Sequence, residues 1–97
     1  FLVDITDPIK VAKLPADITK KLGTPDCLIN NAGIIQPFVK INELKLEDAA
    51  HVMNVNFTGP LMLVKAFLPG LLKRSEAHIL NVSSMNPAPK LCSIQYG

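Results

Sequence analysis

Three short apolar runs are spaced along the chain, at residues 1–3, 27–29 and 79–82. Runs this short, apolar on both faces, are typical of strands buried inside a parallel sheet. Longer segments with helical patterns separate them, so we predict the order strand, helix, strand, helices, strand. This order indicates an α/β fold built from parallel βαβ units with right-handed crossovers.

The first helical segment has a clear start and a clear end. Asp7 is a good N-cap, and Pro8 suits the first helical position, where its missing N–H costs nothing. We expect the helix to break near Lys13, because Pro15 removes a backbone donor and clashes with the preceding turn. It should restart at Pro15 and end at Gly23.

Two further helices are expected before the last strand. Asn42 can cap the first of them, with the acidic residues Glu43, Glu47 and Asp48 in its early turns. The second should run over residues 56–73, and Pro69 should kink or loosen its last turns. Its apolar residues recur at three- and four-residue spacing and predict a wide buried face: Val64, Phe67, Leu68, Leu71 and Leu72.

Composition narrows the choice of function. Ninety-seven residues fit at most one domain, and a net charge of +2 with scattered Lys and Arg argues against nucleic acid as a partner. The apolar stretch 61–72 is interrupted by Lys65 and is shorter than the roughly 18 residues of a membrane span. Cys27 and Cys92 lack metal-site spacing, so we expect no metal and a reducing, cytoplasmic setting.

A polar cluster follows each expected strand: Asp4, then residues 30–33, then Ser83 and Ser84. Ligands of an open parallel sheet bind outside the carboxyl ends of its strands. Each cluster alone is better explained as turn or capping chemistry, but three together predict one binding site. Gly33 would let a ligand approach the backbone closely.

Four segments carry a family resemblance. Residues 30–33 read Asn-Asn-Ala-Gly, residues 54–59 read Asn-Val-Asn-Phe-Thr-Gly, residues 81–84 read Asn-Val-Ser-Ser with Tyr96 shortly after, and residues 4–7 read Asp-Ile-Thr-Asp. In this order and spacing they resemble the classical short-chain dehydrogenase/reductase family. The resemblance implies that residues 1–97 are the central part of a Rossmann-like, doubly wound domain with three α/β/α layers.

The resemblance also implies a nicotinamide cofactor, NAD or NADP, and assigns residues to it. Asp4 would bind the adenine amino group, with Ile5 beside the ring. Asn30, Ala32 and Gly33 would line the adenosine ribose and the neighbouring part of the cofactor. The residues that normally decide between NAD and NADP lie on a strand that we expect before Phe1, so the choice stays open.

The implied reaction moves a hydride between the cofactor and a small carbonyl or alcohol substrate. Ser84 would hold the substrate oxygen, Tyr96 would act as acid/base and touch the cofactor, and Asn56 would hold a water at a distorted helix turn. This division of labour fits the chemistry, because a developing alkoxide needs one polarising group and one proton donor. The interval to Tyr96 is about one residue short of the family's, which leaves Ser83 as an alternative to Ser84.

The chain begins inside an apolar run and ends at Gly97, so we expect a longer parent reading frame. A Gly-rich turn should precede Phe1, and a Lys that lowers the pKa of Tyr96 should follow Gly97 with the substrate loop. We expect the 97 residues alone to be inactive and the parent to form homo-oligomers, although an intramolecular core explains the apolar helix face equally well. The alternatives are a non-catalytic binding or interaction module and, more remotely, a flavodoxin-like nucleotide binder.

Overall fold

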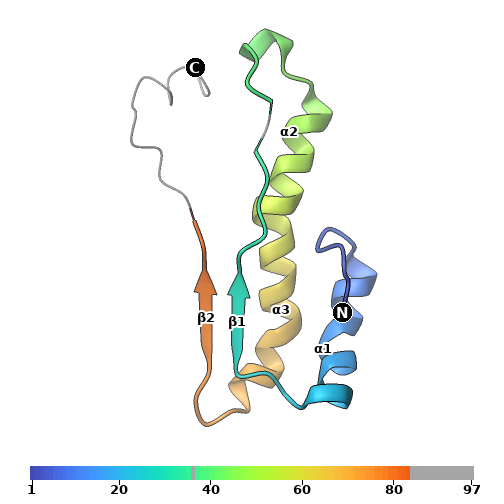
Figure 1. The fold of residues 1–97 in the computed structure, drawn as a ribbon, viewed down its shortest axis with the longest axis vertical. Helices are drawn as coiled ribbons and strands as arrows, with labels where there is room; N and C mark the ends of the chain where they lie inside the picture. Colours follow the sequence, from blue (N-terminus) through green and yellow to red (C-terminus); the bar gives the residue numbers. More distant parts are fainter. Residues whose placement is uncertain (36, 84–97) are drawn as a thin grey trace.

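The computed structural model describes residues 1–35 and 37–83. Two parallel strands lie beside one long helix and one shorter helix (Figure 1). In chain order the elements are α1 (Pro8–Leu22), β1 (Cys27–Asn30), the 3-10 helix η1 (Ile41–Glu43), α2 (Leu46–Met53), the π-helix η2 (Asn54–Thr58), α3 (Gly59–Leu72) and β2 (His78–Asn81).

The sheet consists of β1 and β2, which pair in parallel from Cys27 opposite His78 to Asn30 opposite Asn81. A backbone bond from Val82 N–H to the Asn30 carbonyl extends the pairing by one residue. The predicted second and third strands are therefore confirmed as parallel neighbours, with bounds shifted by one residue. The connection between them is the long helix, as a βαβ unit requires.

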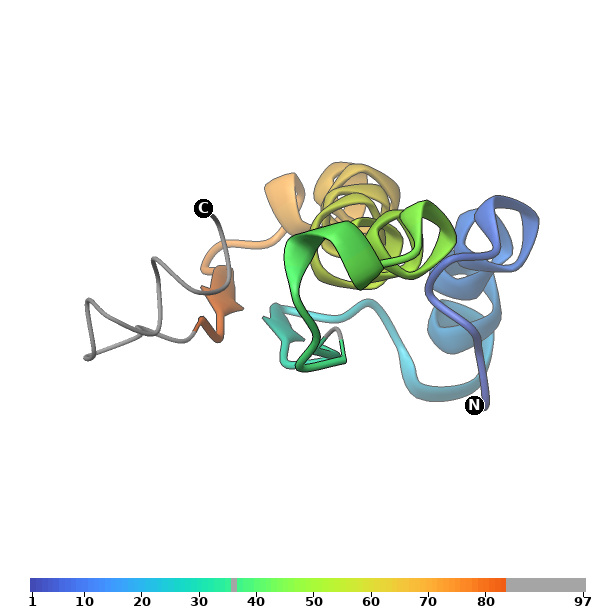
Figure 2. The same cartoon turned by 90° about the horizontal axis from the view of Figure 1, so that it is seen from above.

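Helices cover one face of this sheet (Figure 2). α3 packs on β1 and also on α1, which lies farther from the strands. Among the described residues no helix covers the other face, so Ile29 and Leu80 remain 58% and 54% exposed. The expectation of strands buried on both faces is wrong for this part of the chain, because burial depends on a second helical layer.

The predicted strand at residues 1–3 is also wrong, since this segment has no strand pairing. Phe1 and Leu2 are 66% and 102% exposed, and Lys21 Nζ lies 5.7 Å from the centre of the Phe1 ring. A strand exists only through hydrogen bonds to a neighbouring strand. The described residues provide no neighbour for this segment, so its apolar pattern alone does not produce one.

α1 begins as predicted. The Asp7 carboxylate accepts hydrogen bonds from the N–H groups of Ile9 and Lys10, and Pro8 occupies the first turn. The predicted break near Lys13 is wrong, because the helix continues through Pro15 to Leu22. Packing against α3, with Val11 fully buried in the contact layer, holds the helix together across the proline.

The end of α1 is confirmed at Gly23. This residue has φ +92°, and its N–H bonds to the Thr19 carbonyl. Among the described residues it is the one backbone position with positive φ. A residue with a side chain is strained in this conformation, so the glycine is what allows the sharp exit toward β1.

The segment after β1 differs more from expectation. Asn42 lies within η1 and caps no helix; α2 starts after Lys45, which makes no side-chain capping bond. Glu47 and Asp48 do occupy the first turn of α2, where the helix dipole favours acids. The helix then continues through η2 into α3, so the separate helix start predicted at residue 56 is wrong.

This continuous helix, Leu46–Leu72, has 27 residues and is long and apolar enough to cross a membrane by length and composition. The apolar helix is therefore longer than predicted from residues 61–72, which alone are too short to span a membrane. Core helices of soluble proteins pass the same test. Asn56 lies midway along the helix and is bonded to the loop after β1, and α3, the second half of the helix, packs on β1.

The core is small. Among the described residues the buried apolar side chains are Val11 of α1 and Phe67 and Leu71 of α3, and α3 packs on both α1 and β1. α3 remains helical past Pro69 to Leu72, so the expected loosening of its last turns is not seen. Leu68 and Leu72 are 37% and 75% exposed, which makes the buried face of the helix narrower than predicted.

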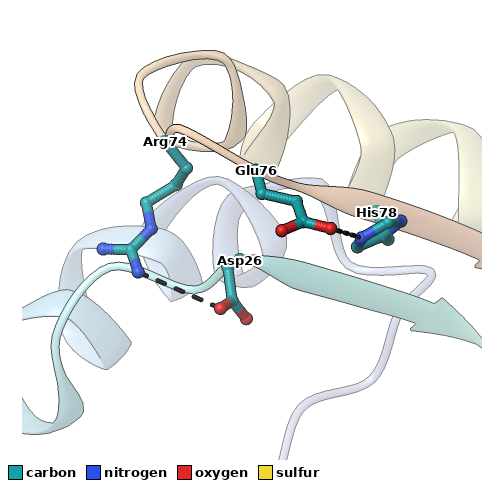
Figure 3. Close-up of polar contacts among 4 residues, drawn as sticks. All are labelled: Asp26, Arg74, Glu76 and His78. Carbon is teal, nitrogen blue, oxygen red and sulfur yellow. Dashed lines mark hydrogen bonds and ion pairs between the residues drawn. The ribbon is translucent and has the colours of Figure 1, made fainter.

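Two exposed polar pairs lie at the amino ends of β1 and β2 (Figure 3). Arg74 lies 3.9 Å from the Asp26 carboxylate, and His78 Nε2 lies 3.1 Å from Glu76 Oε1. All four side chains are at least 45% exposed, and surface ion pairs contribute little to stability. The position of β2 is therefore set by its backbone pairing with β1.

Candidate functional site at the carboxyl ends of the strands

Asn56 lies on the π-turn that joins α2 to α3. The wider turn is closed by a hydrogen bond from Gly59 N–H to the Asn54 carbonyl, five residues back. The Asn56 side chain reaches the loop after β1, accepting from Ile34 N–H at 2.8 Å and donating to the Ile34 carbonyl at 2.7 Å. π-turns inside helices occur frequently at functional sites, and this one ties the helix to the strand end.

A second amide pair joins the two strands. Asn30 and Asn81 are partners in the sheet register, and Asn30 Nδ2 donates to Asn81 Oδ1 at 2.8 Å. Asn30 is 6% exposed, and its Oδ1 has no hydrogen-bond partner among the described residues. Its Nδ2 therefore ties the two strand ends together, while Asn30 also lines the hollow that extends along α3.

Two adjoining hollows open at the carboxyl ends of the strands. One has a volume of about 420 Å³ and is bordered by the loop of residues 31–35. The other, of about 350 Å³, extends along α3. Both are lined by Ala32, Asn56, Val82 and Ser83. The polar clusters after β1 and β2 therefore meet at one place, as the parallel order predicted.

Gly33 lies at the edge of the larger hollow. A Cβ built at this position would meet Asn56 Oδ1 at 3.5 Å, which is ordinary contact distance. The glycine is therefore not required by crowding. Its effect is to leave the hollow open beside the Asn56 amide, where a side chain would occupy the space.

Asp4 does not join this cluster. It follows no strand, and it lines neither of the two hollows. Its carboxylate accepts hydrogen bonds from Thr6 N–H at 2.9 Å and from Thr6 Oγ1 at 2.7 Å, and these bonds lower the pKa of Asp4 below its usual range. The prediction of three strand ends meeting at one site is thus wrong for the first of them.

Ile5, next to Asp4, is half-buried and packs elsewhere. Its side chain lies against Gly59, at the junction of η2 and α3. The segment before α1 is therefore in contact with the same helix that carries Asn56. The sequence offered no indication of this contact, because the two residues lie 54 positions apart and neither type marks such a pair.

Comparison with known proteins decides the family. The sequence profile of the short chain dehydrogenase family matches residues 1–96. The chain belongs to the short-chain dehydrogenase family. The resemblance carried by the Asn-Asn-Ala-Gly segment and the later motifs is thereby confirmed at the level of the family.

Individual relatives agree. The chain is 38% identical over 82 residues to mouse dehydrogenase/reductase SDR family member 7B, covering 84% of this chain and 25% of that protein. It is 36% identical over 81 residues to the NADPH-dependent pterin aldehyde reductase of Arabidopsis thaliana, covering 84% and 34%. The chain thus spans between a quarter and about a third of the length of these relatives.

The fold agrees as well. The structure of ElxO with NADP bound superposes with a TM-score of 0.77 and 34% sequence identity, over 87% of this chain and 34% of that one. The two parallel strands and their crossover helix are therefore part of a Rossmann α/β fold. This confirms the predicted fold class for the portion of the domain that the chain represents.

Of the site residues that the dehydrogenase resemblance implied, the structure brings together Asn30, Ala32, Gly33 and Asn56 around the two hollows. Ser83 stands at both hollows, one residue before Ser84. Ser84 and Tyr96 lie outside the described residues. The motif of residues 81–84 assigns no role to Asn81, whose register position opposite Asn30 shows that it links the two strands.

The larger hollow fits part of a nicotinamide cofactor. Its lining includes the loop residues from Asn31 to Ile35, and Gly33 leaves room beside the Asn56 amide. Ribose hydroxyls and amide groups of a dinucleotide pair well with backbone donors and acceptors at the carboxyl edge of a sheet. The residues present are thus compatible with cofactor binding at this edge.

Proposed function

We propose that the chain is the central part of an NAD(P)-dependent oxidoreductase that acts on a small carbonyl or alcohol substrate. The observation that supports this most strongly is the junction at the strand ends. Asn56, on a π-turn, is bonded to the loop after β1, beside the hollow that Ser83 also lines. The match of the short chain dehydrogenase profile to residues 1–96 supports the same conclusion.

In this proposal the loop of residues 31–35 holds the nicotinamide cofactor. Ala32 and Gly33 border the larger hollow and would present their backbone to the ribose. Asp4 and Ile5 would serve the adenine end, a role that rests on the family resemblance. The cofactor, when bound, supplies or accepts the hydride.

The chain's own residues would handle the substrate oxygen. Ser84 would donate a hydrogen bond to it, and Tyr96 would exchange a proton with it as the oxygen gains or loses negative charge. A phenol has an ordinary pKa near 10, so a cation close to Tyr96 is needed for it to act as a base near neutral pH. The family resemblance implies that this cation is a lysine beyond Gly97.

Asn56 would act both by position and through its remaining hydrogen-bonding capacity. Its two bonds to Ile34 use one lone pair of Oδ1 and one N–H of Nδ2, so among the described residues a second lone pair and a second N–H stay free to hold a water. The same two bonds fix the loop that borders the hollow. We therefore assign Asn56 to the alignment of the loop with the helix, in addition to the water-holding role that the family resemblance implies.

The test uses the full reading frame that contains this chain. The purified protein should oxidise NADH or NADPH in the presence of a panel of aldehydes and ketones. Tyr96→Phe and Ser84→Ala should each lower kcat by roughly 100-fold or more while cofactor binding persists. Ser83→Ala is the matched control and should retain most of the activity.

Two results would overturn the proposal. Wild-type protein that binds neither cofactor and turns over no substrate would favour the non-catalytic module. A larger loss from Ser83→Ala than from Ser84→Ala would transfer the role of the oxygen-binding hydroxyl to Ser83. Cofactor choice follows from the same assay, by comparing kcat/KM for NADH and NADPH.

We also propose that the parent protein is a cytoplasmic homo-oligomer that associates through α3. Leu61, Leu68 and Leu72 are 47%, 37% and 75% exposed along this helix. Apolar side chains that recur on an exposed helix face favour burial against another helix. Light scattering should show a dimer or tetramer for the parent, and Leu68→Lys should shift it toward the monomer.

A further inference from the structure

Among the glycines of the described residues, Gly59 has the least room for a side chain. It is the buried first residue of α3. A Cβ placed there would lie 2.7 Å from Ile5 Cδ1 and 2.9 Å from Ile5 Cγ1. It would also lie 3.1 Å from the Asn54 carbonyl oxygen. Real Cβ atoms essentially never approach other atoms within 3.0 Å. The Ile5 side chain therefore occupies the space that a Cβ at position 59 would need.

The contact between Gly59 and Ile5 joins the π-turn to the segment before α1. Gly59 closes the π-turn by its N–H bond to Asn54, and the turn carries Asn56. Ile5 belongs to the short turn before α1, closed by a bond from Asp7 N–H to the Asp4 carbonyl. The missing side chain of Gly59 thus sets how closely the segment before α1 approaches the turn that holds the loop after β1.

We infer that Gly59 is a positioning residue, which sets the placement of the Asp4–Ile5 segment against the Asn56 turn. The consequence for cofactor affinity rests on the proposed function, in which Asp4 and Ile5 serve the adenine end. An alanine at position 59 pushes Ile5 outward, and because Asp4 is adjacent in the chain, its carboxylate moves with it. Asn56 keeps its two bonds to Ile34, which involve neither Gly59 nor Ile5.

Gly59→Ala and Ile5→Ala form a double-mutant cycle that tests this in the full-length protein. Gly59→Ala alone should raise the Kd for NADH or NADPH about tenfold, as expected for overpacking at a tight contact. In an Ile5→Ala background both clashing carbon atoms are absent and only the 3.1 Å approach to the Asn54 carbonyl remains, so the same substitution should raise Kd by much less. The KM for the carbonyl substrate and kcat at saturating cofactor should change much less than Kd.

Gly70→Ala is the matched control on the same helix. A Cβ at position 70 would meet Thr24 Cγ2 at 3.4 Å, a contact that a small movement relieves. Alanine normally stabilises a helix interior relative to glycine, so this variant should melt at the same or a higher temperature and bind cofactor normally. Gly59→Ala should instead melt at a lower temperature, despite the same gain in helix propensity.

An equal increase in Kd from Gly59→Ala in both backgrounds would overturn the inference, because Ile5 would then not transmit the effect. Melting temperatures of the same four proteins keep the contact testable if the proposed function fails. Should wild-type protein bind neither cofactor, the oxidoreductase proposal is wrong. The Gly59–Ile5 coupling then stands or falls on whether Ile5→Ala removes most of the loss of melting temperature caused by Gly59→Ala.

Discussion

The side-chain amide of Asn56 holds both backbone groups of Ile34, accepting from its N–H at 2.8 Å and donating to its carbonyl at 2.7 Å. Asparagine is suited to this arrangement because one side chain presents a donor and an acceptor on the same plane. The two bonds span 22 residues and join the π-turn to the loop after β1. They hold in place the loop that borders the larger hollow.

Asn56→Asp should break this arrangement with almost no change in size. A carboxylate can still accept from Ile34 N–H, but its second oxygen would face the Ile34 carbonyl with no hydrogen between them. We expect a loss of about 1–2 kcal/mol in the free energy of unfolding, measured by urea denaturation. Asn42→Asp, an exposed position in η1, is the control and should change stability by much less.

The same variant separates alignment from general instability in the assay of the full-length protein. If the loop is held by Asn56, the aspartate variant should lose cofactor affinity and activity under conditions where it is still fully folded. Retention of full activity by folded Asn56→Asp would contradict a role for the Ile34 bonds in the site.

The hydrogen-bonded pair of Asn30 and Asn81 across the strands leads to a second prediction. Asn81→Leu should cost about 1–3 kcal/mol, because it leaves the Asn30 amide buried without its partner. Replacing both residues by leucine removes both polar groups, so the double variant should lose less than the sum of the two single losses. Chemical denaturation of the four proteins gives the coupling energy directly, and simple additivity would show that the hydrogen bond contributes nothing.

Local chemistry explains why part of the fold could be predicted. The Asp7 cap and the Gly23 exit depend on backbone groups two to four residues away, so neighbouring sequence is sufficient. Two apolar runs likewise became β1 and β2, since each finds the other as a partner. The run at residues 1–3 has the same pattern without a strand beside it, and pattern alone cannot supply one.

Tertiary contacts explain the errors. Packing of α1 on α3 outweighs the helix-breaking tendency of Pro15, and one long helix replaces the two expected between residues 42 and 73. In the site, motifs identified Asn56 and the loop after β1, but their direct bond could not be read from spacing. The contact between Ile5 and Gly59 was equally hidden, because only three-dimensional placement gives either residue its role.

Asp4 should make the stability of the protein sensitive to acid. Hydrogen bonds from Thr6 N–H, then from Thr6 Oγ1, lower the pKa of the Asp4 carboxyl from its ordinary value of 3.8. A lowered pKa in the folded state means that the ionised carboxylate stabilises the fold above the ordinary pKa. That contribution is lost as the pH falls through the lowered value.

Asp4→Asn provides the comparison, because the amide oxygen can still accept from Thr6 but does not titrate. Above about pH 5 the wild type should be slightly more stable than Asp4→Asn, and the difference should shrink as the pH falls below about 4. Melting curves across pH 2–7 at constant ionic strength measure this. A difference that stays constant over the whole range would show that the Asp4 charge is not coupled to folding.

Gly23 allows a test of backbone strain without interference from packing. Its φ of +92° is a conformation that residues with a Cβ rarely adopt, and a Cβ there would meet no atom within 4 Å. Gly23→Ala should therefore destabilise the protein by about 1–3 kcal/mol through the backbone alone. Because Gly23 has ψ 171°, it lies outside the αL region that asparagine tolerates, so Gly23→Asn should cost as much as Gly23→Ala. A clearly smaller loss for Gly23→Asn in urea denaturation would indicate that the end of α1 rearranges into an αL turn and that the observed backbone conformation is not needed to lead the chain from α1 into β1.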